Sequence, residues 1–246
     1  MLFKDAIIME KLPAYINIVF GLTTILSVFI FYKATNHSKK TLIILLIWLA
    51  VQTVIGLSGF YTVTDTLPPR FIILVLPPLL LIIGLFATVK GRHFIDSLDT
   101  KALTILHIIR IPVEIVLFWL FLNKTVPELM TFEGRNFDIL SGLTAPAIFY
   151  FGYITKHLDR KIILIWNFIC LALLINIVVN AALSAPSPFQ KFAFDHPNIA
   201  VLHFPYNWLP SCIVPLVLFT HLATIRQLIN NGQKEKHLLT SPQGVK

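Results

Sequence analysis

Three ionisable side chains interrupt the apolar stretch Leu103–Leu122: His107, Arg110 and Glu114. An α-helix advances about 100° per residue. With His107 at an angle of zero around the helix axis, Arg110 lies at about 300° and Glu114 at about 340°. Ionisable groups at membrane depth cost about 2.5–3.5 kcal/mol each on insertion scales and normally face a bundle interior or a wet cavity. This narrow helix face is therefore the first candidate for a functional site.

The spacing of Arg110 and Glu114, four residues apart, lets their side chains meet on a helix. A guanidinium at this site would bind a carboxylate or an anionic headgroup in bidentate fashion, with Glu114 as its counter-charge or as a proton acceptor. His107, one turn towards the cytoplasm, would relay protons or respond to pH. The alternative is structural: a buried ion pair that only holds helices together.

Further polar side chains in apolar segments extend the candidate ligand site. Gln52 belongs to the second apolar run, and Asn176 and Asn180 stack on one face of the sixth because they lie four residues apart. Interhelical packing is the structural alternative for all of them. Four polar residues from the segments that we expect outside the membrane are predicted at the external mouth of the site: Glu133, Arg135, Asp138 and His203.

The composition places the surrounding chain in a membrane. Of its 246 residues, 56% are hydrophobic and only 13% are charged, and the mean hydropathy is +0.79. The apolar runs are about 17 to 25 residues long, which matches an α-helix that crosses about 30 Å of hydrocarbon rather than a β-strand. The net charge of +8 is distributed over short loops, so no nucleic-acid partner is expected.

Seven apolar runs predict an all-α, seven-transmembrane-helix bundle over residues 1–225, followed by a flexible cytoplasmic tail over residues 226–246. Pro77, Pro78 and Pro112 predict kinks in the third and fourth spans, because proline removes a backbone donor. The predicted spans are Leu12–Tyr32, Thr41–Thr62, Phe71–Val89, Leu103–Leu122, Leu140–Thr155, Ile162–Leu183 and Tyr206–Ile225.

The distribution of basic residues predicts the orientation. Thirteen lysines and arginines follow the first, third, fifth and seventh spans, whereas six lie in the remaining loops and the N-terminal segment. The positive-inside rule then puts the N-terminus outside and the C-terminus inside. We expect a multi-pass protein of a bacterial cytoplasmic (inner) membrane, with membrane lipids as its partners, and the sequence carries no signal for an oligomeric state.

Two known seven-helix architectures can be compared residue by residue. Zinc hydrolases of the ceramidase and adiponectin-receptor type need three histidines around one metal, but His107, His203 and His221 are predicted in both membrane halves. No lysine lies between Val201 and Ile225, so the last span has no residue for a retinal Schiff base. We therefore expect no metal and no cofactor, and we leave open whether the protein is an enzyme.

Three stretches carry a resemblance to a known group: residues 107–114, 132–146 and 186–198, within a similarity that covers about half of the chain. They resemble an uncharacterised group of bacterial seven-helix integral membrane proteins, and this resemblance implies no activity. From the residues, we predict that the protein binds or transports a small anionic or amphipathic ligand, including a lipid, in a polar intramembrane cavity. A membrane-embedded enzyme acting on lipid and a non-catalytic or receptor-like scaffold are the alternatives.

Overall fold

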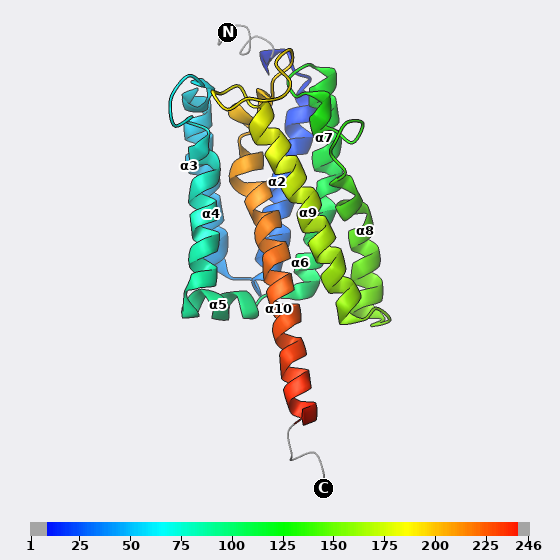
Figure 1. Cartoon of the computed structure of the whole chain (residues 1–246). Coiled ribbons are helices and arrows are strands. Elements are labelled where there is room, and N and C mark those ends of the chain that lie inside the picture. The colour runs from blue at the N-terminus through cyan, green and yellow to red at the C-terminus, as the bar shows by residue number, and fades with distance from the viewer. Residues whose placement is uncertain (1–8, 241–246) are drawn as a thin grey trace.

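The structure is a computed structural model that describes residues 9–240, with the backbone alone for residue 231 and residues 233–240. The described residues form helices and connecting turns, without a β-strand. The long helices run alongside one another as a bundle, and the C-terminal part of the last helix extends beyond it (Figure 1). The predicted all-α class is confirmed.

Nine α-helices and several short helical turns make up the described chain. The 3₁₀ turn η2 (His107–Ile109) joins α6 to α7, while the π-helical turns η4 (Tyr150–Ile154) and η6 (Leu209–Ile213) end α8 and begin α10. The α-helices are α2 (Ala14–Ala34), α3 (Lys39–Leu57), α4 (Ile72–Ala87), α5 (Val89–Asp96), α6 (Thr100–Leu106), α7 (Arg110–Leu122), α8 (Ile139–Phe149), α9 (Arg160–Ser184) and α10 (Val214–Thr240).

Five helical segments of the described chain are long and apolar enough to cross a membrane. They are Ala14–Ala34, Lys39–Leu57, Thr100–Leu122, Arg160–Ser184 and Leu209–Asn230, and the bent pair of α4 and α5 makes a sixth if it counts as one span. The segment Ile139–Ile154 is a shorter apolar helix. The protein is therefore a membrane protein with five or six candidate spans.

Prolines account for the irregular turns in three of these segments. Pro112 cannot donate to the carbonyl of Ile108, and the chain forms the 3₁₀ turn η2 at that point. Pro146 precedes the π-helical turn η4, and Pro210 lies within η6. By contrast, α4 continues through its two prolines, and the 93° bend follows Ala87, where α5 begins.

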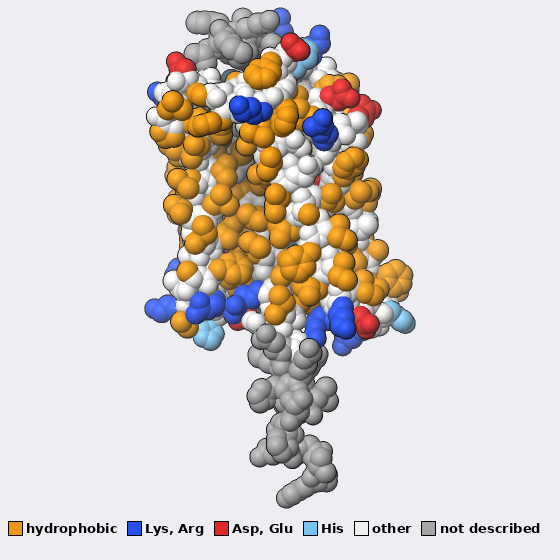
Figure 2. Space-filling view, viewed as in Figure 1, with side chains coloured by type: hydrophobic (Ala, Val, Ile, Leu, Met, Phe, Trp, Pro, Cys, Tyr) orange, Lys and Arg blue, Asp and Glu red, His pale blue; other side chains and the backbone are white. Residues whose placement is uncertain are grey.

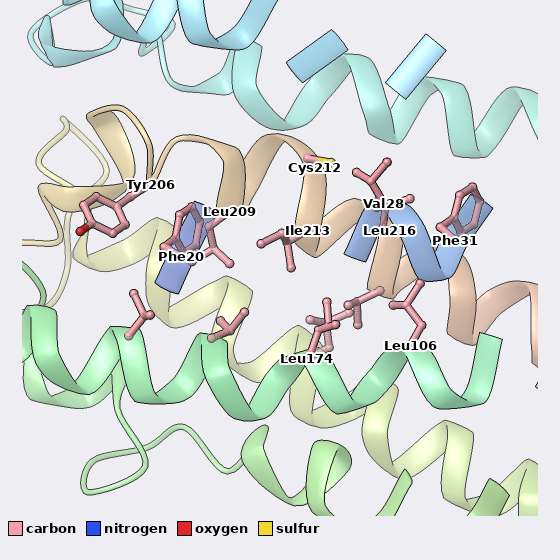
Figure 3. Close-up of a cluster of buried hydrophobic side chains, with 14 of the residues drawn as sticks. Phe20, Val28, Phe31, Leu106, Leu174, Tyr206, Leu209, Cys212, Ile213 and Leu216 are labelled. Carbon is pink, nitrogen blue, oxygen red and sulfur yellow. The ribbon is translucent and has the colours of Figure 1, made fainter. Parts of the chain in front are cut away.

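The last span lies at the centre of the bundle, and α3 lies at its edge. In the span Leu209–Asn230, 67% of the most apolar window is buried, compared with 17% in α3. Helix α10 packs against α9 and α6, while α2 packs against α6 and α7. The main core is formed where these helices meet, with Phe20 and Phe31 from α2, Leu106 from α6 and Leu216 from α10 (Figure 3).

The end of the bundle that carries α5 is basic. Helix α5 lies across this end (Figure 1), where Arg226 of α10 binds Asp96 through two hydrogen bonds of 3.0 Å. Lysines and arginines gather at the same level (Figure 2), and the following residues lie in helix ends and turns there: Lys33, Lys39, Lys40, Lys90, Arg92, Lys101, Lys156, Arg160 and Lys161. Helix α10 continues from this end to Thr240, within the segment predicted to be a cytoplasmic tail.

Candidate functional site

Arg110 is the centre of a buried polar cluster. Only 3% of this residue is exposed, and its Nη1 forms an ion pair with Oδ1 of Asp138, which is also buried. Its Nη2 lies 3.2 Å from Nε2 of His221 on α10. A buried guanidinium is stabilised when its charge and its donors are matched. These two side chains match Nη1 and Nη2, whereas Nε has no hydrogen-bond partner among the described residues.

Asn136 connects the two carboxyl groups of the cluster. Its Nδ2 donates to Glu114 Oε2 at 2.6 Å and to the Met130 carbonyl at 3.0 Å. Its Oδ1 accepts from the backbone N–H of Asp138 at 3.0 Å. The structure thus pairs Arg110 with Asp138, and the direct pair of Arg110 with Glu114 that the spacing suggested is not among the ion pairs of the described residues.

Asn167 and Arg110 together define the protonation state and the tautomer of His221. Nδ2 of Asn167 donates to the Ile163 carbonyl at 2.9 Å, so its Oδ1 is the acceptor that lies 2.9 Å from Nδ1 of His221. Arg110 can only donate, so Nε2 of His221 must accept from it. His221 is therefore a neutral imidazole with its proton on Nδ1.

His107 lies against His221 without sharing its hydrogen bonds. The two rings stack with centroids 3.9 Å apart and an angle of 18° between their planes. His107 is fully buried, and neither ring nitrogen has a hydrogen-bond partner among the described residues. Trp166 on α9 flanks both rings, with its ring centroid 5.6 Å from that of His107 and 6.0 Å from that of His221.

Two glycines allow the backbone to reach these positions. A Cβ on Gly142 of α8 would lie 2.9 Å from Cγ1 of Ile111 and 3.3 Å from Cβ of Arg110, so glycine permits the close contact of α8 with the start of α7. A Cβ on Gly134 would lie 2.3 Å from the carbonyl oxygen of Glu128. That tight turn precedes Asn136 and directs the segment 135–138 into the bundle.

An apolar cavity of about 340 Å³ adjoins the cluster. It lies between α4, α7, α9 and the start of the last span, and Glu114 and Asp138 are the charged residues in its wall. Arg110 is not part of the lining. The apolar wall includes Val75, Leu117, Ile177, Val178, Ala181 and Pro210. The cavity therefore presents carboxyl groups at one place in a surface that is otherwise hydrocarbon.

The structure brings together four of the predicted site residues: His107, Arg110, Glu114 and Asp138. Asp138 was expected at the external mouth, but its exposed fraction is only 5% because it turns inward to Arg110. Gln52 is buried away from the cluster. Its side-chain Oε1 accepts from the hydroxyl of Tyr61 at 2.8 Å, and its backbone carbonyl accepts from Nδ2 of Asn207 at 2.7 Å.

The remaining predicted residues lie outside the cluster. Asn176 is exposed and donates to the Arg135 carbonyl at 2.9 Å. Nδ2 of Asn180 donates to Oδ1 of Asn176 at 3.4 Å. Glu133 and Arg135 are exposed, and His203 is partly buried in the segment that precedes the last span. These residues do not line the apolar cavity.

Three contributors to the cluster were absent from the predicted set: Asn136, Asn167 and His221. Asn167 and His221 are polar residues within apolar spans, which is a usable signal, but their helix faces could not be matched before the packing of α9 on α10 was known. Asn136 lies in a charged loop, where no pattern marks it as buried. Among the described residues, no group of three histidine, cysteine or acidic side chains is arranged to hold a metal ion.

Asn136 provides a first test of the cluster. We expect Asn136→Ala to lower the free energy of unfolding by about 1–2 kcal/mol, because Glu114 Oε2, the Met130 carbonyl and the Asp138 N–H each lose a partner, and polar contacts in membrane proteins are individually modest. Thermal unfolding in detergent measures this loss of stability, and Asn176→Ala, at an exposed residue, is the control. Equal losses in the two variants would contradict the connecting role of Asn136.

The chain belongs to a family defined by a domain of unknown function, DUF8737, which matches residues 67–229. No curated protein and no solved structure matches the chain. The matched region contains every residue of the cluster around Arg110, whereas α2, α3 and Gln52 precede it. The family match therefore includes the whole candidate site and assigns no activity to it.

Proposed function

We propose that the protein binds or transports an amphipathic, lipid-like ligand inside the membrane. The observation that carries this proposal is the apolar cavity with two buried carboxyl groups in its wall. Ligand pockets combine a mostly hydrophobic lining with a few convergent polar groups, and their volumes are about 300–1,000 Å³. At about 340 Å³ the cavity suits a small molecule or one segment of an acyl chain.

The position of the cavity supports a ligand that comes from the bilayer. The cavity lies between α4 and α9, and the surface between these helices is recessed and largely hydrophobic in Figure 2. Ile73 of α4 and Ile175 of α9, next to the lining residues, expose 44% and 52% of their surface. Exposed isoleucines beside an apolar recess are typical of helix faces in contact with lipid.

The amphipathic form of the ligand is better supported than the anionic form. Binding an anion through Arg110 would require its guanidinium to reach the cavity, but Arg110 is not part of the lining, and Nη1 and Nη2 already contact Asp138 and His221. A carboxylate or phosphate placed in the cavity would instead meet Glu114 and Asp138. We therefore retain the amphipathic ligand and revise the role proposed for Arg110 from ligand anchor to support for Asp138.

Our proposal places the protein in a bacterial cytoplasmic membrane with seven spans, counting the bent pair of α4 and α5 once and the short helix Ile139–Ile154 as a span. The basic end of the bundle would face the cytoplasm under the positive-inside rule, with α5 in the interface and the N-terminus outside. The cavity and the segment 123–138 would then lie in the external half.

Filling the cavity tests the proposed function. Val178 lines the cavity, whereas its neighbour Val179 does not and is 48% exposed. We expect Val178→Trp to reduce labelling by a photoreactive ten-carbon alcohol at least fivefold, because the indole occupies the same space, and Val179→Trp to leave it unchanged. Protein in lipid nanodiscs is irradiated, and labelled peptides from α4 and α9 are quantified by mass spectrometry. Equal labelling of all three proteins would contradict a ligand in this cavity.

A further inference from the structure

The buried cluster contains more acidic than basic groups. Arg110 is its guanidinium, and Glu114 and Asp138 are its carboxyl groups, each no more than 5% exposed. His221 adds no charge, because Asn167 and Arg110 hold it as the neutral Nδ1–H tautomer. One positive group therefore faces two acids, and a second positive charge would bring the cluster to neutrality if both acids are ionised.

The acid that is left without a cation faces the cavity. Asp138 is paired with Arg110, whereas Glu114 accepts a hydrogen bond from the neutral amide of Asn136 through Oε2. Oε1 of Glu114 accepts no hydrogen bond from the side chains and backbone groups that the structure describes, although 98% of the residue is buried and it lines the cavity. This is an unused acceptor beside an apolar space.

Arg110 is behind these acids rather than in the cavity wall. Arg110 does not line the cavity, and its Nη1 and Nη2 contact Asp138, on the loop before α8, and His221 on α10. An anionic headgroup in the cavity would thus approach two carboxyl groups before any cation. An ammonium headgroup would meet Glu114 with Asp138 close by, and its N–H groups would supply the missing donor.

We propose that the ligand is an amphiphile with a protonated amine headgroup, bound by Glu114 through Oε1 with its hydrocarbon part in the cavity between α4 and α9. This inference rests on the proposed function, because it assigns the headgroup of the ligand that occupies the same cavity. Asp138, held in place by Arg110 and by the backbone contact to Asn136, adds to the negative potential at the headgroup. The chemistry fits an alkyl amine, a sphingoid-type base or a lipid with a free amino group.

Three photoreactive probes with the same ten-carbon chain test the headgroup. One ends in a primary ammonium, one in a hydroxyl and one in a sulfonate, and each carries the same diazirine. We expect the ammonium probe to label cavity peptides of the wild-type protein in nanodiscs of neutral lipid at least tenfold more than the sulfonate probe. The hydroxyl probe reports occupation of the cavity regardless of headgroup charge.

A pair of glutamate variants locates the preference. We expect Glu114→Gln to abolish the preference for ammonium over sulfonate while labelling by the hydroxyl probe is retained. Glu133→Gln removes the same charge from an exposed residue outside the cavity and should leave the preference intact. Glu114→Gln keeps the shape of the side chain and can still accept from Asn136, and the wild-type comparison decides the headgroup question if the variant fails to fold.

The outcomes separate this inference from the proposed function. If the hydroxyl probe labels the cavity but the wild-type protein favours the sulfonate probe or neither charged probe, the amine assignment is wrong and the cavity remains a binding site. If no probe labels the cavity peptides more than in Val178→Trp, the proposed function fails together with the inference. A tenfold ammonium preference that persists in Glu114→Gln would assign the headgroup to another residue and overturn the role of Glu114.

Discussion

Arg110→Met should lower the free energy of unfolding by about 3–5 kcal/mol, because it leaves the carboxyl group of Asp138 buried without its cation. The same substitution removes the donor to Nε2 of His221. Methionine approximates the length of the arginine stem, so lost packing adds little to the effect. Reversible unfolding in mixed micelles, or the midpoint of thermal unfolding in one detergent, provides the measurement.

The matched control is the second arginine–aspartate pair of the described chain. Arg226 and Asp96 join α10 to α5 with side chains that are 26% and 38% exposed, so Arg226→Met should cost about 1 kcal/mol or less. Adding Asp138→Leu to Arg110→Met should recover much of the lost stability, since an apolar pair replaces an unpaired charge. If Arg110→Met costs no more than Arg226→Met, the buried pair is not the support of the cluster.

His221→Phe should cost about 2–3 kcal/mol, whereas His107→Phe should cost about 1 kcal/mol or less. Both substitutions keep an aromatic ring in the stacked pair, whose centroids lie 3.9 Å apart. Only His221 has hydrogen bonds to lose, and its removal leaves Arg110 Nη2 and Asn167 Oδ1 without their partner. Hydrogen bonds to charged groups are stronger than neutral ones, which is why the loss at His221 dominates.

The free energies of unfolding of the wild-type protein, the two single variants and the double variant are compared at one detergent concentration. Because the two rings touch, the effects of the single variants need not add, and the double variant measures their coupling. If His107→Phe lowered the free energy of unfolding as much as His221→Phe, the ring nitrogens of His107 would have hydrogen-bond partners in the folded protein. The tautomer of His221 can be tested separately, since ¹⁵N chemical shifts distinguish a protonated Nδ1 from a protonated Nε2.

The helix that carries the site could be predicted from the sequence. Three site residues on this helix, His107, Arg110 and Glu114, could be predicted as well. The apolar run around Arg110 is long enough to span a membrane, and three ionisable groups on one face mark it as unusual. The sequence also indicated Pro112 as a point of irregularity, and the turn at residues 107–109 occurs there. These features are local, because they depend on spacing within one helix.

The partners of those residues could not be predicted, because they depend on contacts distant in the chain. Asp138 lies 28 residues from Arg110 and His221 lies 111 residues away. A charged loop such as 131–139 normally stays in water, and here the tight turn at Gly134, the bonds of Asn136 and the ion pair of Asp138 turn it inward. The spacing of Arg110 and Glu114 suggested a pair, but Asn136 binds one oxygen of Glu114 and the guanidinium pairs with Asp138.

The recess between α4 and α9 determines how affinity for the protein has to be expressed. A ligand that reaches its site through the hydrocarbon partitions first into the lipid phase, so the quantity that governs occupancy is its mole fraction among lipids rather than its aqueous concentration. Doubling the lipid at a fixed amount of ligand would halve this mole fraction and lower occupancy, although the site itself is unchanged. Titrations in micelles therefore need the amount of detergent as an explicit variable.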